Sequence, residues 1–178
     1  MTRSGPRPKC IWMTGLPAAG KTTIAYGVEQ RLHRDGRHAS VLDGDRLRLG
    51  LSEDLGYDEA DRIENVRRAA QVARLMVDAG VMVLVAMVSP FQAGRQMARG
   101  LFGHGEFVEV FVDTPLAECE RRDPKGMYAR ARRGELRLFT GIESPYEPPT
   151  DPDIRVSTCL AGIKACVDQV YRHVTGSS

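Results

Sequence analysis

The stretch Gly15-Leu-Pro-Ala-Ala-Gly-Lys-Thr-Thr23 (GLPAAGKTT) decides the fold. It matches the pattern G-x-x-x-x-G-K-[ST], a loop whose backbone N–H groups surround phosphate oxygens. In such a loop the lysine reaches the terminal phosphates of a nucleotide, and the following hydroxyl binds Mg²⁺. The alternative is a glycine-rich turn with an accidental lysine. The candidate nucleotide-binding residues are Gly15, Leu16, Pro17, Ala18, Ala19, Gly20, Lys21, Thr22 and Thr23.

The residues on either side of this loop favour the phosphate-binding interpretation. Residues 9–14 predict a buried strand, and residues 22–34 predict a helix that Gly36 is placed to end. The apolar side chains of that helix share one face: Ile24, Val28 and Leu32. Its N-terminus would add a positive dipole end to the loop. A strand, a glycine-rich loop and a helix in this order is the context that the motif requires.

The composition is typical of one globular α/β domain spanning residues 1–178. Hydrophobic residues make up 42% of the chain and charged residues 27%. The formal net charge of +2 is too small to indicate a nucleic-acid partner. The most hydrophobic run, residues 81–88, has the length of a strand and is too short to span a bilayer.

Two further observations predict a cytoplasmic protein. Residues 1–8 are polar and lack the apolar region of a secretory signal. The four cysteines form no C-x-x-C pair, so we expect them to be reduced and mostly packed. We therefore expect neither a membrane nor a nucleic acid as partner.

Strands and helices are predicted to alternate along the rest of the chain. Strands are expected over 38–42, 81–88, 107–112 and 154–157, and helices over 59–79, near 93–101 and over 160–174. The long helix carries an apolar stripe: Ile63, Val66, Ala70, Ala73 and Val77. Another helix is predicted after Asp113, with Thr114 as its cap and Pro115 in its first turn. This order predicts a P-loop-type three-layer sandwich, with a central parallel sheet and helices on both faces.

Acidic residues after the second predicted strand form a candidate catalytic site. Asp43 and Asp45 flank Gly44 at the carboxyl end of that strand, where open α/β sheets bind ligands. Two carboxylates there could serve Mg²⁺ and an incoming hydroxyl. An ordinary Asp-Gly turn is the alternative. Asp113, at the end of another strand, imitates a magnesium-binding aspartate, but we prefer its helix-capping interpretation.

The segment 121–142 is basic and interrupted by glycines. It is either a solvated charged face or a lid that closes on phosphates and excludes water. The sequence contains no Asn-Lys-x-Asp motif, which a GTPase would need to bind guanine.

Eight motifs beyond the phosphate loop resemble the adenylylsulfate (APS) kinase family, in the family's order and near its spacing. They are 43–48 (DGDRLR), 54–57 (DLGY), 61–68 (DRIENVRR), 89–91 (SPF), 111–116 (FVDTPL), 125–128 (KGMY), 139–142 (FTGI) and 145–147 (PYE). The resemblance covers about residues 11–157, and its match at residues 125–128 favours the lid interpretation of the basic segment 121–142. It implies Mg²⁺-dependent transfer of the ATP γ-phosphate to the 3′-hydroxyl of APS, which gives 3′-phosphoadenylylsulfate (PAPS) in sulfate assimilation.

The resemblance also implies roles for individual residues. The catalytic set is Lys21, Asp43, Asp45 and Ser89, with Thr22 and Asp43 on Mg²⁺. The APS-binding set is Asp45, Arg48, Tyr57, Arg62, Asn65, Val88, Ser89, Lys125 and Phe139. Tyr57, where the family usually has phenylalanine, and Phe139 would enclose the adenine. The family's serine at position 89 is often described as a phosphoserine intermediate, but we favour direct transfer, which positioning and electrostatics can achieve alone.

Four departures from the family pattern leave the acceptor open to question. They are Ala18, Arg46, Gln92 and Gly94, where glycine, asparagine, arginine and aspartate are frequent. The alternatives are a related P-loop kinase for another small-molecule hydroxyl, or a nucleotide-binding regulatory module with little turnover. The resemblance implies a homodimer and leaves association with a sulfate adenylyltransferase open.

Overall fold

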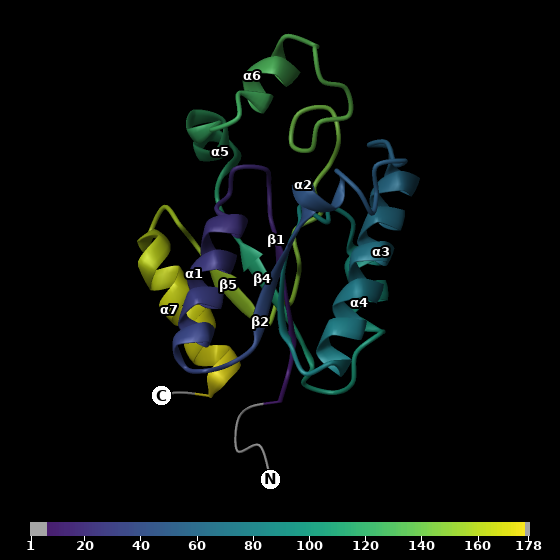
Figure 1. Ribbon diagram of the computed structural model, residues 1–178. Coiled ribbons are helices and arrows are strands. Elements are labelled where there is room, and N and C mark those ends of the chain that lie inside the picture. The colour runs from purple at the N-terminus through teal and green to yellow at the C-terminus, as the bar shows by residue number, and fades with distance from the viewer. Residues whose placement is uncertain (1–6, 177–178) are drawn as a thin grey trace.

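The computed structural model describes residues 7–176, so residues 1–6 and 177–178 lie outside the described residues, including most of the N-terminal stretch interpreted above. Five parallel strands form one sheet in the order β2-β3-β1-β4-β5 (Figure 1). The strands are β1 (Cys10–Thr14), β2 (Ala39–Asp43), β3 (Met82–Ala86), β4 (Phe107–Val112) and β5 (Ile154–Val156). The predicted parallel sheet is confirmed.

Two pairs of helices cover the two faces of the sheet (Figure 1). Helices α1 (Lys21–Arg34) and α7 (Gly162–Thr175) pack on one face, and α3 (Glu59–Asp78) and α4 (Gln92–Arg99) pack on the other. The predicted stripes are buried at Ile24, Val28 and Leu32 and at Val66, Ala70, Ala73 and Val77. Ile63 is only half-buried and lies outside the core. The three-layer sandwich is therefore confirmed.

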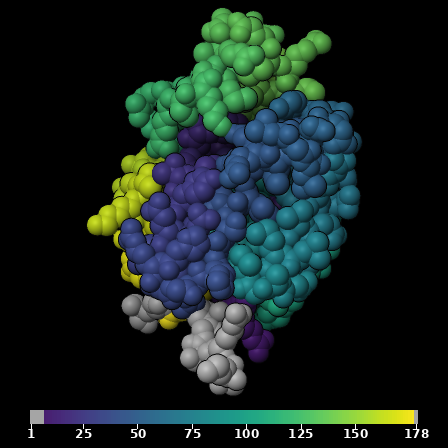
Figure 2. Space-filling view, viewed as in Figure 1, coloured from purple at the N-terminus to yellow at the C-terminus, as the bar shows by residue number. Residues whose placement is uncertain are grey.

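Three short helices lie at the carboxyl edge of the sheet: α2 (Gly44–Leu47), α5 (Leu116–Arg122) and α6 (Met127–Arg132). The segment that contains α5 and α6 extends beyond the body of the sheet, and Figure 2 shows these green residues lying over the purple residues near the phosphate loop. Neither α2 nor a helix within residues 127–132 is predicted from the sequence.

Thr114 does not cap a helix as predicted. Its hydroxyl donates to the Ala19 carbonyl, at 2.9 Å, and shares a 2.9 Å hydrogen bond with the Thr158 hydroxyl. Pro115 takes the cap position of α5, which lacks a side-chain cap. The prediction was wrong because the buried Thr114 hydroxyl finds partners in the phosphate loop and after β5 rather than in its own helix.

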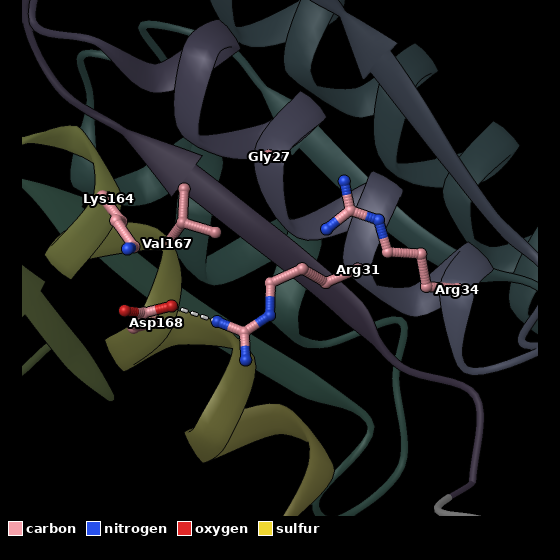
Figure 3. Close-up of a pocket in the computed structure, with 6 residues that line it drawn as sticks. All are labelled: Gly27, Arg31, Arg34, Lys164, Val167 and Asp168. Carbon is pink, nitrogen blue, oxygen red and sulfur yellow. Dashed lines mark hydrogen bonds and ion pairs between the residues drawn. The ribbon is translucent and has the colours of Figure 1, made fainter.

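The helix that follows the phosphate loop packs closely against α7 (Figure 3). A Cβ atom built on Gly27 of α1 would lie 2.6 Å from a methyl carbon of Val167, so only glycine allows this approach. One turn further along α1, Arg31 forms an ion pair with Asp168, and its guanidinium lies 3.9 Å from the centre of the Tyr171 ring. The position of α1 is therefore fixed by side chains of the last helix.

Candidate active site

A cavity of about 990 Å³ opens at the carboxyl edge of the sheet, where parallel sheets bind ligands. It is lined by the phosphate loop, α2, α3, the turn after β3 and the basic segment 121–142, which we call the lid segment after its predicted role. Most predicted site residues line it: Pro17, Ala18, Gly20, Lys21, Thr22, Thr23, Asp43, Asp45, Arg48, Tyr57, Arg62, Asn65, Val88, Ser89, Lys125 and Phe139. Gly15, Leu16 and Ala19 are the predicted residues that do not line it.

The phosphate loop contains backbone conformations that favour glycine. Gly20 has a φ of 109°, and Ala18 has a φ of 63°, in the left-handed region. A non-glycine residue there costs about 1–2 kcal/mol. The frequent family glycine at position 18 therefore has a conformational reason, and this chain carries the strain with alanine.

Lys21 is buried and its amine rests on the loop that it follows. Its Nζ donates to the carbonyls of Gly15, at 3.0 Å, and Leu16, at 2.7 Å. Burial lowers the pKa of Lys21 to about 8, although the nearby Asp45 and Asp43 carboxylates act in the opposite direction. A nucleotide phosphate placed in this loop would supply negative charge and raise the pKa again.

This pKa predicts how nucleotide affinity depends on pH. Below pH 8 the lysine is charged with or without nucleotide, so its contribution is constant; above pH 8 binding must take up a proton. We expect the Kd of an ATP analogue to rise by up to about tenfold per pH unit above that value, until the pKa of the bound state is reached. Calorimetry at pH 7, 8 and 9 measures this. Lys21→Met should remove the dependence, and a wild-type Kd constant over this range would contradict it.

Asp43 and Thr22 meet at the base of the cavity. The Thr22 hydroxyl donates to Oδ2 of Asp43 at 2.7 Å. The other oxygen, Oδ1, accepts from the backbone N–H groups of Asp45 and Arg46 at 2.9 and 3.3 Å and caps α2. The turn interpretation and the metal interpretation of Asp43 are therefore compatible, because each uses a different carboxylate oxygen.

The residues beside the loop suit Mg²⁺ held mainly by phosphate and water. Within residues 7–176, no group of three or more His, Cys, Asp or Glu side chains could hold a metal. Mg²⁺ in phosphoryl-transfer sites takes only one or two protein oxygens. The Thr22 hydroxyl and Oδ2 of Asp43 provide this number.

Asp45 links the body of the protein to the lid segment. Its carboxylate forms an ion pair with Lys125, and both side chains are well exposed to the cavity and solvent. The pair raises the pKa of Lys125. A substrate that enters between them must therefore compete for both charges.

The α3 side of the cavity carries one guanidinium and one amide. Arg62 is 9% exposed and donates through Nε to the Tyr57 carbonyl, at 2.7 Å, and through Nη2 to the Leu138 carbonyl, at 2.6 Å. Oδ1 of Asn65, one turn away on α3, is buried and has no hydrogen-bond partner among the described residues. An unsatisfied buried acceptor costs about 1–3 kcal/mol, so a ligand donor at this place would be favoured.

The two predicted stacking residues differ in their surroundings. Tyr57 is 50% exposed, and the guanidinium of Arg48 lies 4.2 Å from its ring centre. Phe139 is 7% exposed and meets the Tyr128 ring edge-on, at 4.9 Å between ring centres. Both rings line the cavity, but Phe139 also belongs to the hydrophobic core.

Ser89 lies in a strained turn after β3. Its φ is 40°, and its hydroxyl accepts a 3.1 Å hydrogen bond from Nε1 of Trp12 in the central strand. The same hydroxyl donates to the Met87 carbonyl at 3.3 Å. Among the described residues no basic side chain contacts this hydroxyl, so the proton has no acceptor stronger than a carbonyl.

Several cavity residues are not predicted from the sequence. Arg122 donates to the Thr158 hydroxyl at 2.9 Å and lines the cavity with Ile163, beside Gly20. The sequence offers no feature that separates Arg122 from its basic neighbours, and Ile163 is indistinguishable from a helix core residue. Asp113 does not line the cavity. Its helix-capping interpretation is wrong as well, because Pro115 is the cap residue of α5 and no side chain caps that helix. The Asp113 carboxylate lies 3.6 Å from Arg155. Among the described helices none is long and apolar enough to cross a membrane.

Comparison with known proteins gives consistent matches. A family model described as adenylylsulphate kinase matches residues 7–157. The adenylyl-sulfate kinase of Aeromonas hydrophila is 54% identical over 94% of this chain and 85% of its own length. The bifunctional enzyme NodQ of Rhizobium sp. (strain N33) is 57% identical over 91% of this chain, which spans only 25% of NodQ.

Solved structures agree with the sequence matches. The Mycobacterium tuberculosis APS kinase CysC, in complex with AMPPNP and APS, matches with a TM-score of 0.89 and 46% identity, over 97% of this chain and 99% of that chain. A hexameric APS kinase from Thiobacillus denitrificans matches with a TM-score of 0.69 and 27% identity, over 93% of this chain and 28% of that chain. With these matches over most of its length, the chain belongs to the adenylylsulfate kinase family of P-loop kinases.

Proposed function

We propose that this protein transfers the γ-phosphate of ATP to the 3′-hydroxyl of APS, giving PAPS and ADP in sulfate assimilation. The observation that carries the proposal is the single cavity that joins the phosphate loop to a wall of arginines, an aromatic ring and an unsatisfied amide. The relative from M. tuberculosis, whose structure contains AMPPNP and APS, matches along nearly its whole length.

In the proposed reaction the 3′-oxygen of APS forms a bond to the γ-phosphorus as the bond to the β,γ-bridging oxygen breaks. Lys21 stabilises the negative charge that develops on the transferred group and on ADP. Asp45, whose carboxylate lines the cavity, orients the hydroxyl and receives its proton. Arg48, Arg62 and Lys125 bind the sulfated phosphate of the acceptor, because guanidinium and ammonium groups pair with oxyanions.

Mg²⁺ bound with ATP would neutralise charge on the β- and γ-phosphate oxygens. The residues that would hold it are Thr22, through its hydroxyl, and Asp43, through Oδ2. The cap that Asp43 makes with Oδ1 fixes the orientation of its carboxylate.

Direct transfer, without a phosphoserine at Ser89, is part of the proposal. Its hydroxyl is already engaged by Trp12 and Met87, and the residue is 3% exposed. We assign it to the acceptor side of the cavity wall, next to Val88. The unusual residues Gln92 and Gly94 lie on α4 outside the cavity lining, so they give no support to a different acceptor.

The first prediction is the reaction itself. With Mg-ATP and APS the wild-type protein should form PAPS and ADP in equal amounts, measured by chromatography of the nucleotides. Assays with other hydroxyl acceptors and without acceptor are the controls. ADP production that needs a different acceptor would assign the cavity to another substrate, and ATP binding with no turnover would favour a regulatory module.

The second prediction tests the adenine site of APS. Tyr57→Ala should weaken APS binding by about 5- to 150-fold, because a base–aromatic stack contributes about 1–3 kcal/mol. Affinity for an ATP analogue should change little, and Tyr57→Phe, the matched control, should bind APS like the wild type. Phe139→Ala should weaken APS binding as well but also lower Tm, because Phe139 packs on Tyr128 in the core. Normal APS binding by Tyr57→Ala would remove the stacking role.

Assembly and location are part of the proposal. We propose a homodimer, which sedimentation of the purified protein tests; one relative is a hexameric APS kinase. NodQ is a bifunctional enzyme in which a region of this kind occupies about a quarter of the length. Association with a sulfate adenylyltransferase, and a cytoplasmic location, are part of the same proposal and are tested by co-elution and fractionation.

A further inference from the structure

Arg95 of α4 is a buried arginine that lies outside the cavity lining. Its side chain is 2% exposed, and three of its nitrogens donate hydrogen bonds. Nε donates to Oε1 of Glu109 at 3.0 Å, Nη1 to the Ser89 carbonyl at 2.7 Å, and Nη2 to the Glu147 carbonyl at 2.7 Å. One planar group therefore joins β4, the turn after β3 and the segment that follows the lid.

The first of these carbonyls belongs to the turn that lines the acceptor side of the cavity. Ser89 has a φ of 40°, which a non-glycine residue keeps only when its surroundings hold it. The Thr14 hydroxyl, at the end of the central strand, donates to the neighbouring Val88 carbonyl at 2.8 Å. Arg95 and Thr14 thus hold the turn from two sides.

The second carbonyl belongs to the chain that returns from the lid. The Glu147 N–H donates to the Pro90 carbonyl at 2.8 Å, and its carboxylate accepts from the Gln92 N–H at 2.7 Å. The hydroxyl of the preceding residue, Tyr146, lies 2.9 Å from the Thr14 hydroxyl. The return segment is therefore tied to the same turn by main-chain and side-chain contacts, with Arg95 at the junction.

We propose that Arg95 is a positioning residue for the acceptor site, a role that rests on the proposed function. It lies outside the lining of the cavity that would hold both substrates. It fixes the strained Ser89 turn and anchors to it the segment that returns from the lid, so that lid closure and the shape of the APS wall are coupled. The role requires a planar guanidinium with three donors in fixed directions, which lysine does not provide.

The ion pair with Glu109 offers a way to separate positioning from stability. Glu109→Gln removes the charge partner but leaves Arg95 and both carbonyl acceptors in place. Arg99→Met is the matched control. Arg99 is on the same helix and approaches Glu109 at 3.7 Å, but its hydrogen bond goes to the Asp153 carboxylate, at 2.7 Å, and not to Ser89 or Glu147.

The experiment measures kcat, the KM of each substrate, Tm and amide hydrogen exchange in the full-length protein. Arg95→Met should raise the KM for APS by about tenfold or more, the scale for losing a hydrogen bond from a charged donor. The KM for ATP should stay within about twofold, and the amides of Gln92 and Glu147 should exchange faster. Arg95→Lys should retain the fold but not restore the KM. Glu109→Gln should lower Tm with little change in the KM for APS, and Arg99→Met should resemble wild type.

Three outcomes would overturn the role. They are equal increases in the KM of ATP and APS, a KM increase in Glu109→Gln as large as that in the Arg95 variants, and unchanged exchange at Gln92 and Glu147. If Arg95→Met does not fold, Arg95→Lys is the test variant, because it keeps a buried cation near Glu109. A KM for APS equal to that of the wild type in Arg95→Lys would then overturn the role. The exchange measurement needs no turnover. A wild-type protein that fails to make PAPS would contradict the proposed function, but exchange at Gln92 and Glu147 would still test the contacts that Arg95 makes.

Discussion

Replacing Lys21 with methionine is expected to lower kcat by about 10³-fold or more, the scale for losing a cation that stabilises a phosphoryl-transfer transition state. The fold should survive. Folding depresses the pKa of Lys21 to about 8, which means that the folded state disfavours its charge at pH 7. An uncharged side chain of similar length avoids this penalty, so Tm should stay the same or rise.

Opposite changes in activity and stability would distinguish a functional lysine from a structural one. Lys164→Met is the matched control, because Lys164 is an exposed lysine on α7 outside the active cavity. Steady-state assays with APS and a melting curve for each variant provide both readouts. Lys21→Met activity within a few-fold of wild type would remove the phosphate-loop assignment.

Asp45→Asn is expected to lower kcat by about 10²- to 10⁴-fold, the usual range for loss of a general base. The substitution keeps the shape of the side chain and removes the charge that faces the cavity. Asp54→Asn is the matched control, because Asp54 is also exposed but pairs with Arg68 outside the cavity. A normal kcat in Asp45→Asn would leave Asp43-Gly44-Asp45 as a turn and a helix cap.

The ion pair with Lys125 adds a second way to interpret the result. If Asp45 acts only by holding the lid through Lys125, then Asp45→Asn, Lys125→Met and the double variant should lose similar activity. If Asp45 acts on the hydroxyl, its single substitution should have the larger effect on kcat. Single-turnover measurements of all three variants separate the two roles.

The sheet and its main helices were predictable because each carries its own periodic pattern. The uninterrupted apolar residues of β3 and the three- and four-residue spacing of Val66, Ala70, Ala73 and Val77 report burial without reference to the rest of the chain. The site at the carboxyl edge followed from the phosphate loop and from Asp43, since a parallel sheet brings both to one edge.

The features that were missed depend on contacts between distant residues. Thr114 has the position of a cap, but its hydroxyl bonds to a carbonyl 95 residues away. Arg122 joins the cavity by contacting Thr158, and Arg95, in the sequence an ordinary charge on a helix, is almost fully buried. Helix α2 was missed because Asp-Gly is typical of turns, and only the folded Asp43 cap makes it helical.

The close contact between Gly27 and Val167 has a mechanical consequence for the reaction. Helix α1 begins directly after the phosphate loop, so any sliding of α1 would move the N–H groups that face the phosphates. Gly27 lets α1 approach α7 so closely that a Cβ there would lie 2.6 Å from a Val167 methyl carbon, and this close packing opposes such sliding. The loop dipoles are therefore already oriented before ATP arrives, and little reorganisation energy is needed in the transition state. Helix α7 therefore holds α1 in place, and through α1 it holds the phosphate loop at the N-terminal end of that helix.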